Sequence, residues 1–248
     1  MIFKPMKSIV KQIANLLGFE VCRMIPSSSA CAQIVSALKL VETDTVFDIG
    51  ANTGQFVKYI RNAGYQGKII SFEPLKSATM YLTESVKRDP RWMLHERCAI
   101  GNYDGEVEIN IAGNSVSSSV LSMHPSHAEA ALGSAYVSSE KVSIKMLDSI
   151  ASQYFNRNSK LFIKIDTQGY EWQVLDGAAE TLGRAQGLIC ELSLIPLYEG
   201  QKLWRDVIDR LDQEGFMLWA LQKGFTDPRT GQSLQMDGIF LRRDVLKS

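Results

Sequence analysis

The chain of 248 residues lacks an excess of either charge, because 27 lysines and arginines balance 27 acids. Proteins that bind nucleic acid usually show a basic bias, so we expect no nucleic-acid partner. The sequence also lacks any apolar run of about 20 residues, the length that spans a bilayer. These absences favour a globular protein of the cytoplasm.

Cysteine is scarce, and the four cysteines include no Cys-x-x-Cys pair. Cys98 and Cys190 fall within or beside apolar, strand-like runs, so we expect buried thiols there. Nothing suggests a disulfide framework, which again fits a reducing cytoplasm. With 45% hydrophobic residues, the chain can bury the core of one α/β domain with insertions.

The most informative stretch lies at residues 45–56. Its apolar, β-branched and aromatic start predicts a buried strand. A glycine-containing turn follows, and residues 55–62 have the apolar spacing of a helix. A strand, a glycine turn and a helix form the first half of a nucleotide-binding βαβ unit.

The glycine pattern of dinucleotide-binding proteins is missing from this turn. The places of its second and third glycines hold Asn52 and Gln55. The sequence has Asp48-x-Gly50-x-Asn52-x-Gly54 instead. An acid before the turn repels phosphate and suits a cation, and S-adenosylmethionine (SAM) carries a sulfonium and no phosphate. We expect Asp48 to face the positive end of SAM and helix-start N–H groups to face its carboxylate.

A second acid supports this interpretation. Glu73 ends the next expected strand, residues 67–74, and lies 23 residues after Gly50. A ribose-binding acid is expected at a spacing of about 20 residues. Adenine should lie in an apolar slot beside Phe72 and the turn at residues 99–102. The expected cofactor-binding residues are Asp48, Gly50, Asn52, Gly54, Phe72, Glu73, Ala99, Ile100, Asn102 and Asp166. Two alternatives to SAM binding are that the turn binds another nucleotide, or that it binds no ligand and Glu73 is a surface residue.

Strands and helices alternate along the rest of the chain. We expect strands at residues 91–100, 106–111, 141–146, 161–166, 187–194, 216–221 and 237–241, and helices at 30–40, 77–87, 170–176 and 201–213. Strands 106–111 and 141–146 alternate polar and apolar residues and are candidates to pair. The last two strands are joined by a short loop, which suits an antiparallel pair. The pattern predicts one doubly wound domain, residues 41–248.

A helical extension, residues 1–40, precedes that domain. Residues 5–24 have the pattern of an amphipathic helix. We expect it to dock on the core or on a neighbouring subunit of a homo-oligomer; a weak anchor on a membrane surface is the alternative. Lys11 and Asn15 interrupt its apolar stretch, which argues against a signal peptide.

Residues 113–140 form a long segment rich in serine and small residues, with weak periodicity. Such segments are usually functional or disordered. This one follows the third strand, at the sheet edge where ligands bind in open α/β folds. We expect a lid or substrate loop, with residues 125–132 as a short helix.

Five motifs together resemble the FkbM-type SAM-dependent methyltransferases, over about residues 41–242. They are Asp48-Ile49-Gly50-Ala51-Asn52-Thr53-Gly54, Phe72-Glu73-Pro74, Met146-Leu147-Asp148-Ser149-Ile150, Lys164-Ile165-Asp166-Thr167-Gln168-Gly169-Tyr170-Glu171 and Asp237-Gly238-Ile239-Phe240-Leu241-Arg242. The resemblance implies a Rossmann-like class I sheet of seven mostly parallel strands with an antiparallel last strand. It also implies O-methylation of a small-molecule hydroxyl, on a sugar or a polyketide-type natural product. An N-methyltransferase and a non-catalytic SAM-binding scaffold protein are the alternatives.

An alcohol is a poor nucleophile at neutral pH, so methyl transfer to it needs a general base or a metal. Asp166 and Glu191 end core strands, and they can act as base or hold a divalent cation such as Mg²⁺. His124 and His127 in the expected lid are the other base candidates. The alternatives are that Asp166 only caps the following helix or contacts SAM, that Glu191 only pairs with a nearby cation or amide, and that each histidine is a solvated surface group. Lys164 is expected to face away from Asp166 and to have a structural or ion-pair role, and His95 a structural one.

Overall fold

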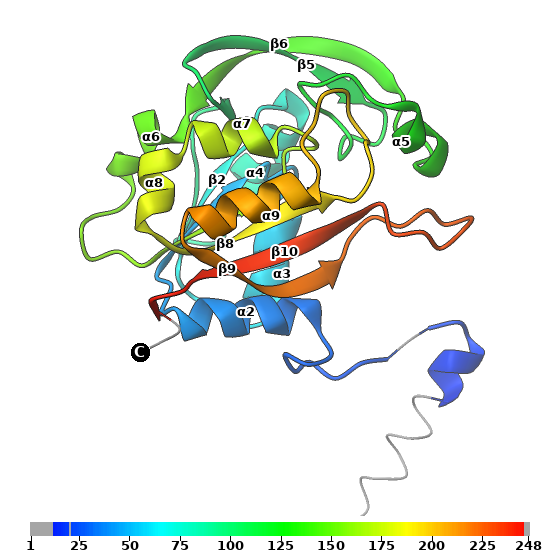
Figure 1. Ribbon diagram of the computed structural model, residues 1–248, viewed down its shortest axis with the longest axis horizontal. Coiled ribbons are helices and arrows are strands. Elements are labelled where there is room, and N and C mark those ends of the chain that lie inside the picture. The colour runs from blue at the N-terminus through cyan, green and yellow to red at the C-terminus, as the bar shows by residue number, and fades with distance from the viewer. Residues whose placement is uncertain (1–11, 20, 246–248) are drawn as a thin grey trace, which may run out of the picture.

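The structure, a computed structural model, describes residues 12–19 and 21–245 and is built on one large sheet (Figure 1). Its seven strands have the order β3-β2-β1-β7-β8-β10-β9. Their bounds are β1 Thr45–Ile49, β2 Lys68–Phe72, β3 Trp92–Leu94, β7 Leu161–Ile165, β8 Ala185–Ser193, β9 Phe216–Lys223 and β10 Gln235–Arg242. Only β10, the last strand of the chain, runs against its two neighbours. The expected doubly wound, mostly parallel sheet with an antiparallel last strand is confirmed.

Helices cover both faces of this sheet (Figure 1). One apolar core lies between the sheet and the helices α7 Glu171–Asp176, α8 Ala179–Arg184 and α9 Trp204–Gln213. A second core lies between the other face and α2 Ala30–Leu40, α3 Gln55–Asn62 and α4 Lys76–Val86. Side chains alternate along a strand, so Val46 and Asp48 of β1 face this second set of helices. This alternation decides which side chains reach the cavity described in the next section.

A smaller sheet of three strands adjoins the large one, in the order β4-β6-β5. It consists of β4 Ala99–Gly101, β5 Gly105–Ala112 and β6 Tyr136–Met146. β5 pairs with β6 antiparallel, as expected for residues 106–111 and 141–146. The single expected strand over residues 91–100 was wrong, because β3 pairs with β2 and β4 leaves the large sheet to pair with β6.

The segment between β5 and β6 carries one short helix, α5 Pro125–Ala130, where residues 125–132 were expected to be helical. After β6 come a short helix, α6 Leu147–Ile150, and a 3₁₀ turn, Ala151–Gln153. Cys98 and Cys190 are buried as free thiols, as the sequence predicted.

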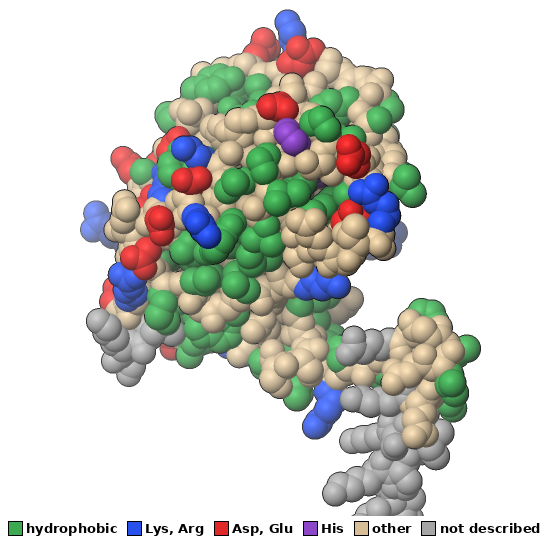
Figure 2. Space-filling view, turned by 45° about the vertical axis from the view of Figure 1, so that its right-hand side comes forward, with side chains coloured by type: hydrophobic (Ala, Val, Ile, Leu, Met, Phe, Trp, Pro, Cys, Tyr) green, Lys and Arg blue, Asp and Glu red, His purple; other side chains and the backbone are tan. Residues whose placement is uncertain are grey.

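Residues 12–19 stand away from the sheet and its helices (Figures 1 and 2). The expected amphipathic helix falls partly outside the described residues, and residues 12–16 are helical. Ile13, Leu16 and Phe19 are exposed, so residues 12–19 do not dock on the core, whereas α2 of the expected extension does. Among the residues that the structure describes, no helix is long and apolar enough to cross a membrane.

Candidate active site

The turn after β1 brings the backbone of two strands very close together. Gly50 has φ +74°, and a Cβ there would lie 1.8 Å from the carbonyl oxygen of Asp166. Only glycine permits this approach. Gly54 also has a positive φ, but a Cβ on it would meet the Trp92 ring, so it serves packing and does not line the cavity described below.

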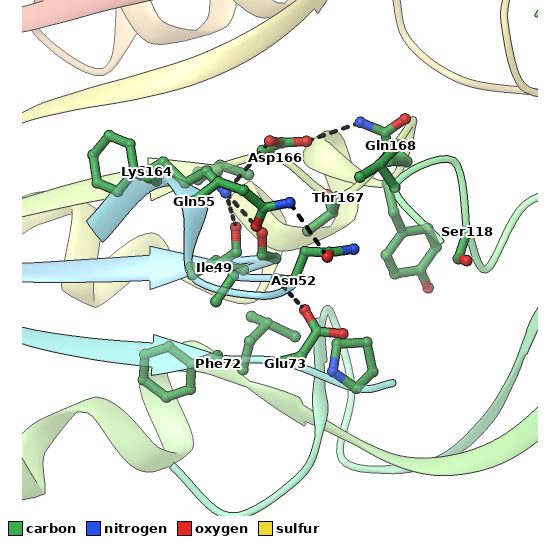
Figure 3. A pocket seen from close by; sticks show the side chains of 18 of the residues that line it. Ile49, Asn52, Gln55, Phe72, Glu73, Ser118, Lys164, Asp166, Thr167 and Gln168 are labelled. Carbon is green, nitrogen blue, oxygen red and sulfur yellow. Dashed lines mark hydrogen bonds and ion pairs between the residues drawn. The ribbon is translucent and has the colours of Figure 1, made fainter. Parts of the chain in front are cut away.

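Glu73 lies just beyond β2 with its carboxylate buried beside this turn. One carboxylate oxygen accepts from the backbone N–H of Asn52 at 2.6 Å (Figure 3), and the other accepts from the backbone N–H of Leu75 at 2.8 Å. Burial raises its pKa to about 7, against the lowering effect of these two hydrogen bonds. Each carboxylate oxygen keeps a second lone pair, so Glu73 can still accept from a ligand diol.

An apolar slot adjoins Glu73, as expected for adenine. Phe72, Ala99 and Ile100 line it, together with Cys98 and Leu75. Asn102 is exposed in the turn after β4 and does not line the slot. The structure therefore brings Gly50, Asn52, Phe72, Glu73, Ala99, Ile100 and Asp166 to one cavity and leaves Asp48, Gly54 and Asn102 outside its lining.

Asp48 does not face the cavity, where the sequence placed it. Its side chain is fully buried in β1, accepts a hydrogen bond from Ser71 Oγ and pairs with Lys164 Nζ at 3.3 Å. Lys164 Nζ also lies 3.4 Å from Asp166 Oδ2 and donates to the carbonyl oxygen of Gly50. The ion-pair role expected for Lys164 is confirmed. The expectation that its side chain faces away from Asp166 was wrong, since Lys164 and Asp166 are two residues apart and side chains two apart on a strand share a face.

This arrangement keeps Lys164 charged. Burial alone would lower the pKa of its amine, but the carboxylates of Asp166 and Asp48 outweigh that effect and raise it. Lys164 therefore neutralises a fully buried carboxylate on one side and orients Asp166 on the other. Figure 3 shows Asp166 reaching across the turn from Glu73, with Asn52 between them.

Asp166 and Glu191 come together, but an amide separates them. The Nε2 of Gln168 donates to Asp166 Oδ1 at 2.9 Å and to both oxygens of Glu191 at 3.2 Å. A donor group thus occupies the place between the carboxylates where a cation would bind. Among the described residues, no group of three or more His, Cys, Asp or Glu side chains is arranged to hold a metal. The residues present do not fit the magnesium site considered from the sequence.

The two histidines of the segment at residues 113–140 lie outside the lining of the cavity. His124 is the N-cap of α5 and accepts from the backbone N–H of Ser126. His127 is buried against Tyr198, and its Nε2 lies 3.0 Å from Ser117 Oγ. Burial lowers its pKa, so it is neutral at pH 7. Neither geometry brings a histidine to the place expected for a base. His95 has the expected structural setting, with its Nδ1 at 2.5 Å from Tyr154 Oη.

The cavity at the carboxyl ends of the parallel strands has a volume of about 360 Å³. Residues from the serine-rich segment close one side of it: Ser115, Val116, Ser118, Ser119 and Val120. Among the polar residues that line it are Gln168 and Asp237, which belong to the motifs of the family resemblance but were given no role at the site. One signal could have found Asp237: an antiparallel strand begins where parallel strands end, so its first residues reach the ligand edge.

A mostly parallel seven-stranded sheet, with a glycine turn after β1 and acids after β2 and β7, defines a class I methyltransferase. Residues 48–218 match the family model described as the methyltransferase FkbM domain. The chain belongs to this FkbM methyltransferase family.

Solved structures with a similar fold include three methyltransferases. An FkbM methyltransferase from Methylobacillus flagellatus is 14% identical with a TM-score of 0.46, and the match covers 79% of this chain and 44% of that one. An rRNA methylase from Streptococcus thermophilus (10% identity, TM-score 0.44) matches over 85% of this chain and 96% of its own.

A precorrin-6y C5,15-methyltransferase from Geobacter metallireducens (14% identity, TM-score 0.43) matches over 90% of this chain and 92% of its own. The chain spans less than half the length of the Methylobacillus protein. No curated protein matches the chain in sequence.

Proposed function

We propose that the protein transfers the methyl group of SAM to a hydroxyl of a small molecule, a sugar or a polyketide-type natural product. One observation carries this proposal: a single cavity runs from the buried carboxylate of Glu73 to the partly exposed carboxylate of Asp166. Its volume of about 360 Å³ lies within the range of small-molecule sites, about 300–1,000 Å³.

The residues at the Glu73 end fit a nucleoside. Glu73 can accept from a ribose diol through its free lone pairs, and Phe72, Ala99 and Ile100 offer the apolar contact that adenine needs. Backbone N–H groups at the start of α3 are placed to receive a carboxylate. Bound there, SAM supplies a methyl group on a positively charged sulfur.

At the other end, the protein must hold the acceptor oxygen about 3 Å from the methyl carbon and take up its proton. Asp166 is the residue that we assign to this task. It lines the cavity, and Lys164 and Gln168 hold its two oxygens. The new O–C bond forms as the C–S bond breaks, the electron pair of that bond stays on sulfur, and the hydroxyl proton passes to Asp166.

The test combines binding and turnover. Calorimetry should show binding of both SAM and S-adenosylhomocysteine, and release of S-adenosylhomocysteine should be stimulated by sugars with free hydroxyls. Binding without turnover on any acceptor would favour a scaffold protein, and turnover on RNA alone would favour the other methyltransferase classes.

Asp166→Asn should lower kcat by a factor on the order of 10²–10⁴, the range of general-base catalysis, with little change in SAM affinity. The matched control is Asp176→Asn, on the surface of α7 and outside the cavity. Wild-type turnover in Asp166→Asn would remove Asp166 from the mechanism.

A further inference from the structure

Three carboxylates stand in a row across the ligand edge of the large sheet. Asp237 of β10 is the direct register partner of Glu191 of β8. Asp166 follows Ile165, whose register partner Cys190 precedes Glu191. Residues side by side in a sheet point to the same face, so all three carboxylates project toward the face that α2 and α3 cover.

This row lies at the end of the cavity away from the nucleoside slot. Asp166 and Asp237 line the cavity there, and Gln168 separates Asp166 from Glu191. The opposite wall is apolar and partly aromatic, and it comes from two helices: Ala30 and Ile34 of α2, and Phe56 and Tyr59 of α3. The first residue of α2, Ala30, is fixed in place because its carbonyl oxygen accepts from Gln222, the register partner of Asp237 on β9.

The charge at this end is unbalanced. Lys164 is shared between Asp48 and Asp166. Among the described residues, no hydrogen bond or ion pair reaches the carboxylate of Asp237. Lys223 also lines the cavity, but it follows Gln222 along β9, so its side chain leaves on the face opposite to Asp237. Burial, and then the charge of Asp166, raise the pKa of Asp237 to about 6 against the lowering effect of Lys164, so Asp237 is ionised at pH 8.

Resting on the proposed methyl transfer, we propose that Asp166 and Asp237 form the acceptor end of the cavity, and that Asp237 binds the acceptor beside the point of transfer. A site of this charge takes a molecule that presents hydrogen-bond donors, hydroxyls or a protonated amine, and that carries no phosphate or carboxylate at this end. An anion would lie against two carboxylates, with Lys164 already engaged by Asp48 and Asp166 and with Lys223 on the opposite face of β9. Hydroxyl donors instead satisfy the lone pairs that Asp237 leaves open.

Sinefungin, the SAM analogue with an amine in place of the methyl-bearing sulfonium, probes this charge directly. Its ammonium occupies the methyl position, so it should bind the wild-type protein about tenfold more tightly than S-adenosylhomocysteine, the size of one charge-assisted contact. Asp237→Asn should remove most of this difference and leave S-adenosylhomocysteine affinity unchanged. Asp209→Asn, an exposed position on α9, is the control that removes the same charge outside the cavity.

Equal sinefungin preference in the wild type and in Asp237→Asn would overturn the assignment of Asp237. Loss of affinity for both ligands in a folded variant would overturn it as well. Failure of the wild-type protein to bind either ligand would instead overturn the proposed function, and this inference with it.

The acceptor class is tested with a matched set of sugars: a hexose, its 2-amino derivative, its uronic acid and its 6-phosphate. Release of S-adenosylhomocysteine should be stimulated by the neutral or amino members and not by the two anionic ones. Turnover of an anionic sugar faster than that of the neutral and amino sugars would overturn the proposed acceptor class. The ratio of sinefungin affinity to S-adenosylhomocysteine affinity decides the role of Asp237 whichever sugars react.

Discussion

At the scale of single residues, one buried lysine organises the charges of the site. Lys164 pairs with Asp48, which has no contact with solvent, and with Asp166, which faces the cavity. A buried ion pair contributes little when compared with apolar groups, but removing one partner leaves a buried charge without compensation.

Lys164→Met should therefore lower the free energy of unfolding by about 3–5 kcal/mol, because it leaves Asp48 buried and unpaired. The double variant Asp48→Asn/Lys164→Met removes both charges and should recover much of this loss. Urea denaturation of the wild type and both variants measures the difference. A double variant as unstable as Lys164→Met would show that lost packing, and not charge, causes the effect.

Glu73 makes stability depend on pH. Burial raises its pKa from 4.5 to about 7, so the folded protein holds this proton more tightly than the unfolded chain does. Glu73 therefore contributes up to about 3 kcal/mol to the free energy of unfolding below pH 4.5. This contribution is lost as the pH rises toward 7.

Glu73→Gln should flatten the fall in stability between pH 5 and pH 8, as measured by urea midpoints at both values. The slope should not vanish, because Glu171 and Asp237 also have raised pKa values. Glu106→Gln, on an exposed strand position, is the control. An unchanged slope in Glu73→Gln would mean that Glu73 does not titrate in this range.

Sequence reasoning placed Glu73 and Asp166 at the cavity but misplaced Asp48. An acid that follows the last residue of a strand is free to face the ligand edge. Asp48 instead lies within β1, and it can be buried only because the neighbouring strands supply a hydrogen-bond donor and a cation. Those partners, Ser71 and Lys164, lie 23 and 116 residues further along the chain, and no local pattern indicates the register.

At the scale of elements, the turn after β7 is locked to the segment between β5 and β6. Tyr198 Oη donates to Gln168 Oε1 and lies within hydrogen-bond distance of the carbonyl oxygen of Ser117. Ser119 Oγ donates to the carbonyl oxygen of Gln168 at 2.6 Å. Gln168, which orients Asp166, is therefore held by Ser119 of the expected lid and by Tyr198, which itself contacts Ser117 of the lid.

Tyr198→Phe should loosen this connection, because it removes the hydroxyl that donates to Gln168 Oε1 and contacts the carbonyl oxygen of Ser117, at a cost of about 1–3 kcal/mol. We expect a lower Tm and faster proteolytic cleavage within residues 113–140. Tyr81→Phe, at an exposed position on α4, controls for the loss of a hydroxyl. Cleavage at the wild-type rate would show that Tyr198 does not restrain this segment.

Helices with strong local patterns, such as α2 and α3, were predicted to the residue. The stretch at residues 91–100 was not, because its apolar residues serve two sheets. β4 is fixed by pairing with β6, whose last residues lie more than 40 positions later in the chain. Long-range pairing of this kind is invisible to periodicity.

At the scale of the whole molecule, the two described parts of the expected N-terminal extension differ in what they add to the fold. Residues 12–19 expose Leu16 and Leu17 and lie away from the sheet. By contrast, α2 buries Ile34 and Leu38 in the second core.

Removal of residues 1–20 should leave Tm within about 1 °C of the wild-type value, because surface changes away from packed groups alter stability by only about 0.5 kcal/mol. Removal of residues 1–40 should unfold the protein or lower its Tm by many degrees, since it strips α2 from the core. Differential scanning calorimetry compares the two. A large loss with the shorter truncation would place a stabilising contact in the extension.

The reversed direction of β10 has a consequence for how the protein is made. The nucleoside end of the cavity comes from the first hundred residues, while Asp237 arrives with the last strand to enter the sheet. Because β4 is held by pairing with β6, the nucleoside end still depends on residues up to 146. A chain cut before β10 would keep every residue named for the nucleoside slot and lose an acid of the acceptor end.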